Sequence, residues 1–256
     1  MSVCILASDD LQSRAMLAGI AKDHDVSAVI IEKKNKAAII KTLRYRIRRL
    51  GYKKVVGQLL LLAYDKLFLK RKSLRIIREI LSSFDDLPVG VPVYIVENVN
   101  SQRTLELLEY YQPSLCVVTG TSIIRSEVLN RSPMFLNIHC GVTPRYRGVH
   151  GGFWAVTHED FSNIGVTIHK IDVGVDTGSI VFQQEVAVST DFETHRTLAA
   201  KQYKVGIPLM SKAVNDALAS KLKFVVRDDL NSKQWFSPTL GDYFRFKRNL
   251  KKINSL

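Results

Sequence analysis

Short apolar runs alternate with helix-like stretches at the start of the chain. Ser2–Ser8 and Val26–Glu32 are apolar runs, and Leu11–Lys22 between them has the character of a helix. Parallel strands need a long crossover connection, so this order predicts a β–α–β unit and a parallel sheet. The rhythm resumes later with expected strands at Val91–Glu97, Leu115–Thr119 and Phe135–His139, and with an expected helix over Ser101–Tyr111.

The second half of the chain continues this pattern. Gly165–Ile171 and Ser179–Val188 are predicted to form a pair of strands around a glycine-containing loop. Asp191–Lys221 is predicted to be rich in helix, and Phe224–Arg227 to be a last short strand. The whole pattern predicts an α/β fold with a doubly wound, mostly parallel sheet over residues 1–230, followed by a C-terminal extension over residues 231–256.

A basic helical insertion, residues 33–84, interrupts the alternation. Its expected helices are Lys36–Leu50, Lys53–Leu69 and Ser73–Leu81. Residues 33–78 contain sixteen Lys and Arg and one acid, a net +15, whereas the whole chain carries +13. The basic character therefore belongs to the insertion and not to the fold. Two interpretations stay open, a solvated face on packed helices or a surface that contacts an anionic membrane. We expect no nucleic-acid binding, because aromatic residues are not interleaved with the bases.

Composition narrows the setting. The start of the chain lacks the pattern of a signal peptide, and the longest apolar run, Leu59–Ala63, is too short to span a bilayer. Cys4, Cys116 and Cys140 are widely separated and lack metal-type spacing, and pairing within the chain must leave one unpaired. We therefore expect a cytoplasmic protein without a metal site.

A polar pair ends one of the apolar strands. Side chains alternate along a strand, so Asn137 and His139 point to one face of Phe135–His139. In open α/β sheets, ligands bind in the crevice beyond the carboxyl ends of the strands. The loop that follows, Cys140–Gly148, contains glycine, proline and two arginines and is predicted to form a rim beside that crevice.

A second group of polar residues lies in the loop Asp172–Gly178, with two carboxylates between glycines. A carboxylate close to a histidine holds the ring in orientation and favours its charged form. Either group taken alone is more often structural than catalytic, and this loop supplies too few oxygen ligands for calcium. We expect His150, His158 and His169 to be structural or exposed.

Four segments in a fixed order connect these observations: Leu136–His139 (LNIH), Pro144–Gly148 (PRYRG), Gly165–His169 (GVTIH) and Asp172–Gly178 (DVGVDTG). The run resembles the folate-dependent formyltransferase family, whose signature is an N-x-H strand, a P-K/R-Y-R-G loop, a G-V-T strand and a D-x-G-x-D-x-G loop. That family includes glycinamide ribonucleotide transformylase, methionyl-tRNA formyltransferase and the sugar N-formyltransferases. The resemblance covers Val91–Val188.

The resemblance implies a Rossmann-like formyltransferase fold, with residues 1–230 as the catalytic domain and 10-formyltetrahydrofolate as co-substrate. It implies that Asn137, His139 and Asp176 are catalytic. Asn137 would then hydrogen-bond the oxyanion, His139 would donate to the same oxygen or relay a proton, and Asp176 would orient His139. The residues expected beside the folate are Ser122, Ile123, Ile124, Asp172, Val173 and Val175.

Two departures from the relatives bear on the acceptor amine. Transformylases of glycinamide ribonucleotide carry a glycine-rich phosphate loop after the first strand, where this chain has Ser8-Asp9-Asp10-Leu11, and carboxylates repel phosphate. Methionyl-tRNA formyltransferases add a sizeable C-terminal domain, whereas fewer than 70 residues follow Val188 in this sequence. The chain therefore resembles most the sugar-nucleotide N-formyltransferases, which modify amino-deoxysugars for surface polysaccharides such as O-antigen.

The expected substrate contacts follow from chemistry. Arginine suits phosphate geometry, so Arg145 and Arg147 are expected to meet the diphosphate, and Trp235 is expected to stack on the base. Another amine, such as glycinamide ribonucleotide or methionyl-tRNA, stays open as the acceptor. A homodimer stays open as the oligomeric state. A basic membrane- or nucleic-acid-binding module on a catalytically decayed fold is the alternative of another class, and the complete Asn137, His139 and Asp176 set argues against decay.

Overall fold

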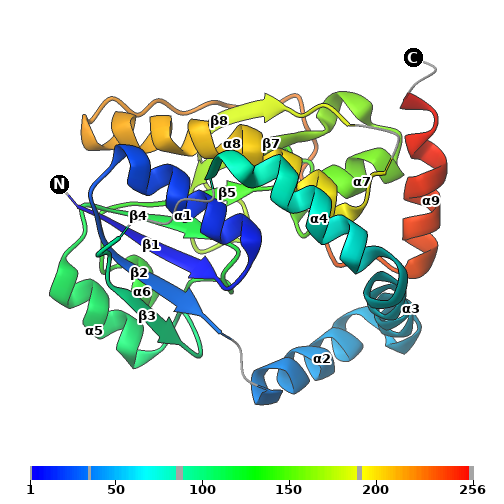
Figure 1. Cartoon of the computed structure of the whole chain (residues 1–256), viewed down its shortest axis with the longest axis horizontal. Helices are drawn as coiled ribbons and strands as arrows, with labels where there is room; N and C mark the ends of the chain where they lie inside the picture. The colour runs from blue at the N-terminus through cyan, green and yellow to red at the C-terminus, as the bar shows by residue number, and fades with distance from the viewer. Residues whose placement is uncertain (1, 34–35, 85–88, 189–191, 254–256) are drawn as a thin grey trace.

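A seven-stranded, mostly parallel sheet forms the centre of the molecule (Figure 1). The computed structural model describes residues 2–33, 36–84, 89–188 and 192–253. The strand order is β3-β2-β1-β4-β5-β7-β8, and β7 is antiparallel to both of its neighbours. The strands are β1 (Val3–Ser8), β2 (Val26–Glu32), β3 (Val93–Val96), β4 (Leu115–Thr119), β5 (Phe135–His139), β7 (Gly165–Lys170) and β8 (Ile180–Glu185). The predicted doubly wound α/β class is confirmed.

The winding direction of the chain reverses between β1 and β4. The chain runs outward from β1 through β2 to β3, and then returns to β4 and β5 on the other side of β1. Such a reversal leaves a crevice at the carboxyl ends of the central strands. Because Asn137 and His139 close β5, beside β4, the topology places both side chains at this crevice.

Helices cover both faces of the sheet. On one face lie α1 (Leu11–Asp23), α4 (Lys70–Leu81) and α8 (His195–Leu218); on the other lie α5 (Gln102–Tyr111) and α6 (Ser126–Leu129) (Figure 1). Fully buried side chains such as Ile5, Met16 and Ile207 fill the space between the sheet and the first group of helices. The apolar runs of the sequence are therefore buried on both faces of their strands, as parallel sheets require.

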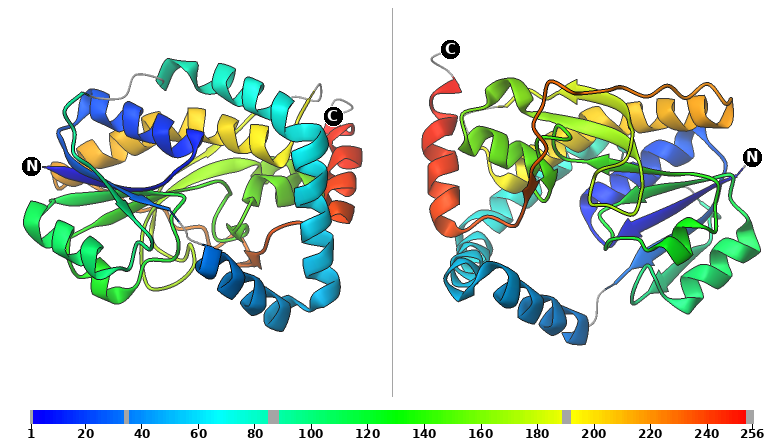
Figure 2. Two further views of the ribbon diagram at one scale, coloured as in Figure 1. Left: turned by 60° about the horizontal axis from the view of Figure 1, so that its bottom comes forward. Right: turned by 180° about the vertical axis from the view of Figure 1, so that it is seen from behind.

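The basic insertion is helical, as predicted, and runs along the outer edge of the molecule (Figure 2). It contains α2 (Lys36–Leu50), α3 (Tyr52–Tyr64), a π-helical turn (Asp65–Leu69, η1), α4 and a 3-10 turn (Ser82–Phe84, η2). The acid Asp65 explains how the segment is attached. Asp65 is buried and accepts hydrogen bonds from the guanidinium of Arg196, at the start of α8, at 3.0 and 3.1 Å.

The C-terminal extension packs against the rest of the chain. The short strand β9 (Gln234–Trp235) pairs in parallel with β6 (Arg147–Gly148) of the rim loop. Helix α9 (Leu240–Leu250) then lies against α3 and α7 (Gly151–Thr157), where Phe246 stacks on Phe153 with ring centroids 4.7 Å apart. The extension thus brings Trp235 back to the crevice.

Several elements differ from the predicted ones. The expected strand Phe224–Arg227 is wrong: only Val225 makes a single antiparallel bridge, to Ile180, because this segment runs past the edge strand with Val226 largely exposed. The short elements α6, α7, β6, β9 and the 3-10 turn Phe161–Asn163 (η3) were not predicted, since tertiary contacts and not periodicity create them. The first residue of the expected helical stretch Asp191–Lys221 lies outside the described residues.

Candidate active site

A cavity of about 410 Å³ opens at the carboxyl ends of β4 and β5. Four parts of the chain enclose it: the loop after β4, the end of β5 with its rim loop, the loop between β7 and β8, and the segment around β9. Its lining includes Gly120–Ile124, Asn137–Cys140, Gly148–His150, His169, Ile171, Asp172, Gly174–Asp176, Tyr203 and Gln234–Phe236. The cavity therefore brings Asp176 together with Asn137 and His139, which lie on β5 more than thirty positions earlier.

Both ring nitrogens of His139 face hydrogen-bond acceptors. Nε2 donates to the backbone carbonyl of Tyr146 at 2.6 Å, and Nδ1 lies 3.3 Å from the carboxylate of Asp176. The side chain is nearly buried, with 5% of its surface exposed. Only a ring with a proton on each nitrogen can donate to both acceptors, so the site accommodates the imidazolium form of His139.

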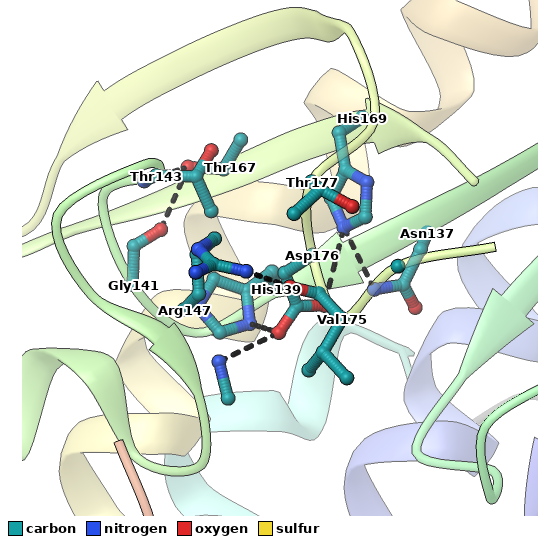
Figure 3. Close-up of polar contacts among 12 residues, drawn as sticks. Asn137, His139, Gly141, Thr143, Arg147, Thr167, His169, Val175, Asp176 and Thr177 are labelled. Carbon is teal, nitrogen blue, oxygen red and sulfur yellow. Dashed lines mark hydrogen bonds and ion pairs between the residues drawn. The ribbon is translucent and has the colours of Figure 1, made fainter. Parts of the chain in front are cut away.

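Asp176 lies at the centre of the polar network (Figure 3). One carboxylate oxygen accepts the Gly148 N–H at 2.7 Å and faces His139, and the other lies 3.5 Å from Nε2 of His169. Burial opposes the charged carboxylate, but the attraction of His139 and the bond from the Gly148 N–H outweigh it. They hold the pKa of Asp176 well below its ordinary value. Asp176 is therefore ionised at neutral pH.

The backbone around Asp176 has unusual geometry. Asp176 itself has φ 49°, in the left-handed region that residues other than glycine rarely adopt. Gly148 has φ 96°, and a Cβ there would collide with the carbonyl oxygen of Trp235. The rim loop therefore ends in glycine because its amide must reach Asp176 while the β9 strand passes directly over it.

His169 belongs to the site, although its sequence context predicted a structural or exposed residue. It is buried, its Nδ1 donates to the carbonyl of Lys170 at 2.9 Å, and its Nε2 lies 3.0 Å from Nδ2 of Asn137. In the antiparallel pair β5–β7, His169 stands directly opposite Asn137. Strand pairing is the signal that could have identified it, because both strands reach the same crevice.

The two rim arginines have different surroundings. The Nε of Arg145 lies 2.6 Å from Asp160, which also accepts from the hydroxyl of Tyr146 at 2.7 Å. Arg147 donates to the carbonyl of Val175 at 2.9 Å, so it ties the rim loop to the loop that carries Asp176 (Figure 3). Neither arginine is part of the cavity lining. Their expected contact with a diphosphate stays a prediction.

Trp235 forms one wall of the cavity. Its indole N–H donates to the carbonyl of Arg145 at 3.1 Å, and its ring stacks against Tyr146 and Trp154 with centroids 5.9 and 4.8 Å apart. These contacts hold the indole in place. Trp235 therefore contributes a fixed aromatic side chain to the cavity wall.

The residues expected beside a folate mostly line the same cavity. Ser122, Ile123, Ile124, Asp172 and Val175 are in the lining, whereas Val173 is 79% exposed and is not. A residue that sequence patterns did not single out supports this wall. The buried carboxylate of Glu32, at the end of β2, accepts the backbone amides of Ser122 and Val99 at 2.7 and 3.1 Å.

In the described part of the chain, no group of three or more His, Cys, Asp or Glu side chains has an arrangement that could hold a metal ion.

The formyl transferase family matches residues 83–214, a stretch that is more than half of the 256 residues and that contains Asn137, His139 and Asp176. The chain belongs to the formyl transferase family. It is similar to the methionyl-tRNA formyltransferase of Desulfotalea psychrophila, with 31% identity over 141 residues, which are 54% of this chain and 43% of the relative. The chain thus spans less than half the length of this curated relative.

Two solved structures share the fold. One is a sugar 3N-formyl transferase in the presence of dTDP and 5-N-formyl-THF, with a TM-score of 0.55, 20% identity, and coverage of 92% of this chain and 69% of that chain. The other is glycinamide ribonucleotide transformylase 1 from Symbiobacterium toebii, with a TM-score of 0.58, 19% identity, and coverage of 92% and 94%. At these identities the likeness concerns the fold alone.

Proposed function

We propose that the chain transfers a formyl group from 10-formyltetrahydrofolate to a primary amine. The observation that carries the proposal is the convergence of Asn137, His139 and Asp176 on a single cavity, in a chain of the formyl transferase family. The three unpaired cysteines favour a reducing compartment such as the cytoplasm for this reaction.

The transfer forms one C–N bond and breaks another. The amine nitrogen adds to the formyl carbon, and the carbonyl electron pair moves onto the oxygen. When that pair returns, the bond to the folate nitrogen breaks, and the proton released by the amine goes to that nitrogen. The protein must therefore stabilise a transient oxyanion and move a proton.

The polar side chains of the cavity suit these two tasks. Nδ2 of Asn137 directs one hydrogen towards His169, which leaves its second hydrogen for the oxyanion. His139 lines the same cavity and its Nδ1 faces Asp176 at 3.3 Å, so it is placed to relay the proton. The charge of Asp176 stabilises the imidazolium that results when His139 takes up a proton.

The co-substrate site must accept a flat heteroaromatic ring, and the residues present fit this requirement. Ile123 and Ile124 supply apolar surface at one end of the cavity, and loop backbone from residues 120–124 and 172–175 supplies polar groups. This combination of apolar walls and a few polar groups is typical of sites for such ligands. 10-Formyltetrahydrofolate would supply the activated formyl group there.

For the acceptor we propose the amine of an amino-deoxysugar nucleotide, used for a surface polysaccharide. Trp235 offers an aromatic wall to a base, and a solved structure of the same fold is a sugar 3N-formyl transferase in the presence of dTDP. Asp10 caps α1 by accepting the Ser13 N–H at 2.8 Å, so a carboxylate already occupies the helix N-terminus that would attract a phosphate. This favours a sugar nucleotide over glycinamide ribonucleotide.

The test is a panel of acceptors with 10-formyltetrahydrofolate, in which release of tetrahydrofolate is followed spectroscopically. We expect turnover with one or more amino-deoxysugar nucleotides and little with glycinamide ribonucleotide or methionyl-tRNA. Efficient formylation of glycinamide ribonucleotide would reject the sugar assignment and keep formyl transfer. If tetrahydrofolate is released without any acceptor and an equal amount of formate accumulates, the reaction is hydrolysis, and the transferase proposal is rejected.

A further inference from the structure

The outer surface of the basic insertion exposes a stripe of apolar side chains. Along α3 and η1, Tyr52, Val56, Leu59, Leu60 and Leu67 follow one another at helical spacing and are exposed, as is Phe68. Leu67 and Phe68 are 73% and 68% exposed. Scattered apolar residues on a surface need no explanation, but a continuous stripe of this length is typical of an interaction surface.

Cations surround the end of this stripe. A groove of about 790 Å³ is lined by Leu67, Phe68, Arg71, Lys72, Leu74, Arg75 and Arg78. Lys72 lies over the ring of Phe192 at 4.2 Å. Within the described ranges, Lys70, Arg71, Arg75 and Arg78 form no ion pair with an acidic side chain. The groove therefore combines an apolar floor with positive charge that is not neutralised by the protein. We call the apolar stripe and this groove together the basic apolar face.

The basic apolar face consists of exposed side chains, whereas other residues of the same helices are buried. The other side of α3 is anchored, because Val55 and Leu61 are buried and Gln58 donates to the carbonyl of Ser237 at 2.7 Å. Packing of Gly57 against Thr239 leaves no room for a Cβ. The helix is thus fixed to the segment next to the cavity wall, and its exposed side chains are available to a partner.

The charge and the side-chain types narrow the choice of partner. A second copy of the chain would place +15 against +15, which is repulsive at the short distances of an interface. Proteins bind single-stranded nucleic acids through bases stacked on aromatic rings, whereas most of the stripe is aliphatic and cannot stack on bases. Aliphatic side chains bordered by Lys and Arg suit the boundary between lipid headgroups and acyl chains.

We propose that the basic apolar face docks the protein on the surface of a membrane that contains anionic phospholipid. Leu67 and Phe68 enter the boundary with the acyl chains, and Arg71, Arg75 and Arg78 meet the lipid phosphates. Among the described helices, none is long and apolar enough to cross a membrane. The proposal does not depend on which amine the active site uses.

Co-sedimentation with vesicles tests the proposal on the full chain. One set of vesicles contains phosphatidylglycerol and phosphatidylcholine in equal parts, and the other contains phosphatidylcholine alone. We expect binding to the anionic vesicles at low salt and its loss at about 0.5 M salt, because salt screens these charges. Lys70→Gln combined with Arg71→Gln and Arg75→Gln should weaken binding about 100-fold, since each base contributes about tenfold or less near an anionic surface.

A matched triple variant controls for net charge. Lys204, Lys221 and Lys223 are exposed elsewhere on the molecule, and their replacement by glutamine should leave vesicle binding within about threefold of the wild type. Leu67→Ser combined with Phe68→Ser keeps all charges and should still weaken binding about tenfold or more, because the inserted apolar surface is lost. Thermal unfolding of each variant checks that the fold is kept.

Three results would overturn the proposal. The first is no binding to anionic vesicles at low salt. The second is an equal loss of vesicle binding in the two triple glutamine variants, which would mean that net charge alone attracts the protein to the vesicles. The third is a change from dimer to monomer in the Leu67→Ser, Phe68→Ser variant with vesicle binding intact, because the stripe would then be an interface between copies.

Discussion

Asp176 and His139 face each other across 3.3 Å, and the same Asp176 oxygen accepts the backbone N–H of Gly148 at 2.7 Å. The carboxylate is therefore positioned by the backbone first and by the imidazole second. This order matters for catalysis, because an anchored carboxylate can keep its place while the charge on His139 changes. The amide of Gly148 thereby holds Asp176 in place beside His139, the residue proposed to carry the proton.

Removal of either partner should stop the reaction and keep the fold. His139→Ala or Asp176→Asn is expected to reduce kcat at least ~100-fold, the usual size of a general acid–base or oxyanion contribution. Both side chains lie at a strand end or in a loop, so circular dichroism should be unchanged. Retention of most of the activity in one variant would remove that residue from the proposed mechanism.

His169 is predicted to be a positioning residue. Its ring lies between Asn137 and Asp176, at 3.0 and 3.5 Å, so His169→Ala should leave both side chains less well oriented. We expect a loss of about tenfold in kcat, with little change in KM for the acceptor. His24→Ala is the control, because His24 bonds to Ser211 on the far side of α8. Equal losses in the two variants would indicate a general effect on packing.

The lowered pKa of Asp176 predicts a pH dependence of stability. A carboxyl group whose pKa falls on folding stabilises the native state fully above its unfolded pKa, about 3.9, and loses this contribution as the pH falls toward the folded-state pKa. The difference in free energy of unfolding between wild type and Asp176→Asn should therefore be larger at about pH 5 than at about pH 3. Urea unfolding at both pH values measures it, and a difference that grows on acidification would contradict the assignment.

Alanine substitutions at two glycines of similar backbone conformation distinguish the effect of backbone strain from that of a steric clash. Gly148 has φ 96° and Gly90 has φ 86°, but only a Cβ at position 148 meets other atoms, whereas position 90 is open. Gly90→Ala should cost about 1–2 kcal/mol of stability from the left-handed backbone alone. Gly148→Ala should cost more and should also lower kcat, because the clash displaces either Trp235 or the amide that holds Asp176. Equal kcat values in the two variants would argue against a role of the Gly148 amide in holding Asp176.

Trp235 should affect the acceptor and not the folate. Trp235→Ala removes the aromatic wall, so we expect KM for the sugar nucleotide to rise about tenfold or more, in line with the value of one stacked base. KM for the folate co-substrate should change little, since the expected folate contacts come from the loops after β4 and β7 and not from β9. Phe244→Ala is a suitable control, because this aromatic residue is exposed on α9. A rise in KM for both substrates would place the two ligands differently.

The long strands and helices of the fold were predictable because burial imposes a clear period on the sequence. β1, β2, β4 and β5 agree with the predicted strands to within one residue, and their alternation also placed Asn137 and His139 on one face. The stretch Phe224–Arg227 is as rich in apolar residues as these strands, but it is not buried within the sheet as they are. It makes one bridge at a sheet edge, and composition alone does not distinguish these two situations.

The parts of the site that were missed depend on contacts between segments distant in sequence. His169 joins the site through its pairing across β5 and β7, and Glu32 supports the loop of Ser122 from a strand ninety positions earlier. The expected roles of Arg145 and Arg147 came from side-chain chemistry alone. The structure shows that both guanidinium groups already have partners, Asp160 and Val175, which no local pattern reveals.

The pairing of β9 with β6 has a consequence for how relatives of this chain can diverge. The reacting groups lie on β5 and on the loop of Asp176. The aromatic wall comes from a segment some sixty positions after Asp176, which joins the rim loop through a two-residue ladder and the bond from the Trp235 indole to Arg145. Exchange of residues 233–239 between relatives would therefore bring a new wall to an unchanged reacting centre. A chimera that keeps Gly148 and the backbone pairing at Trp235 offers a direct route to altered acceptor choice.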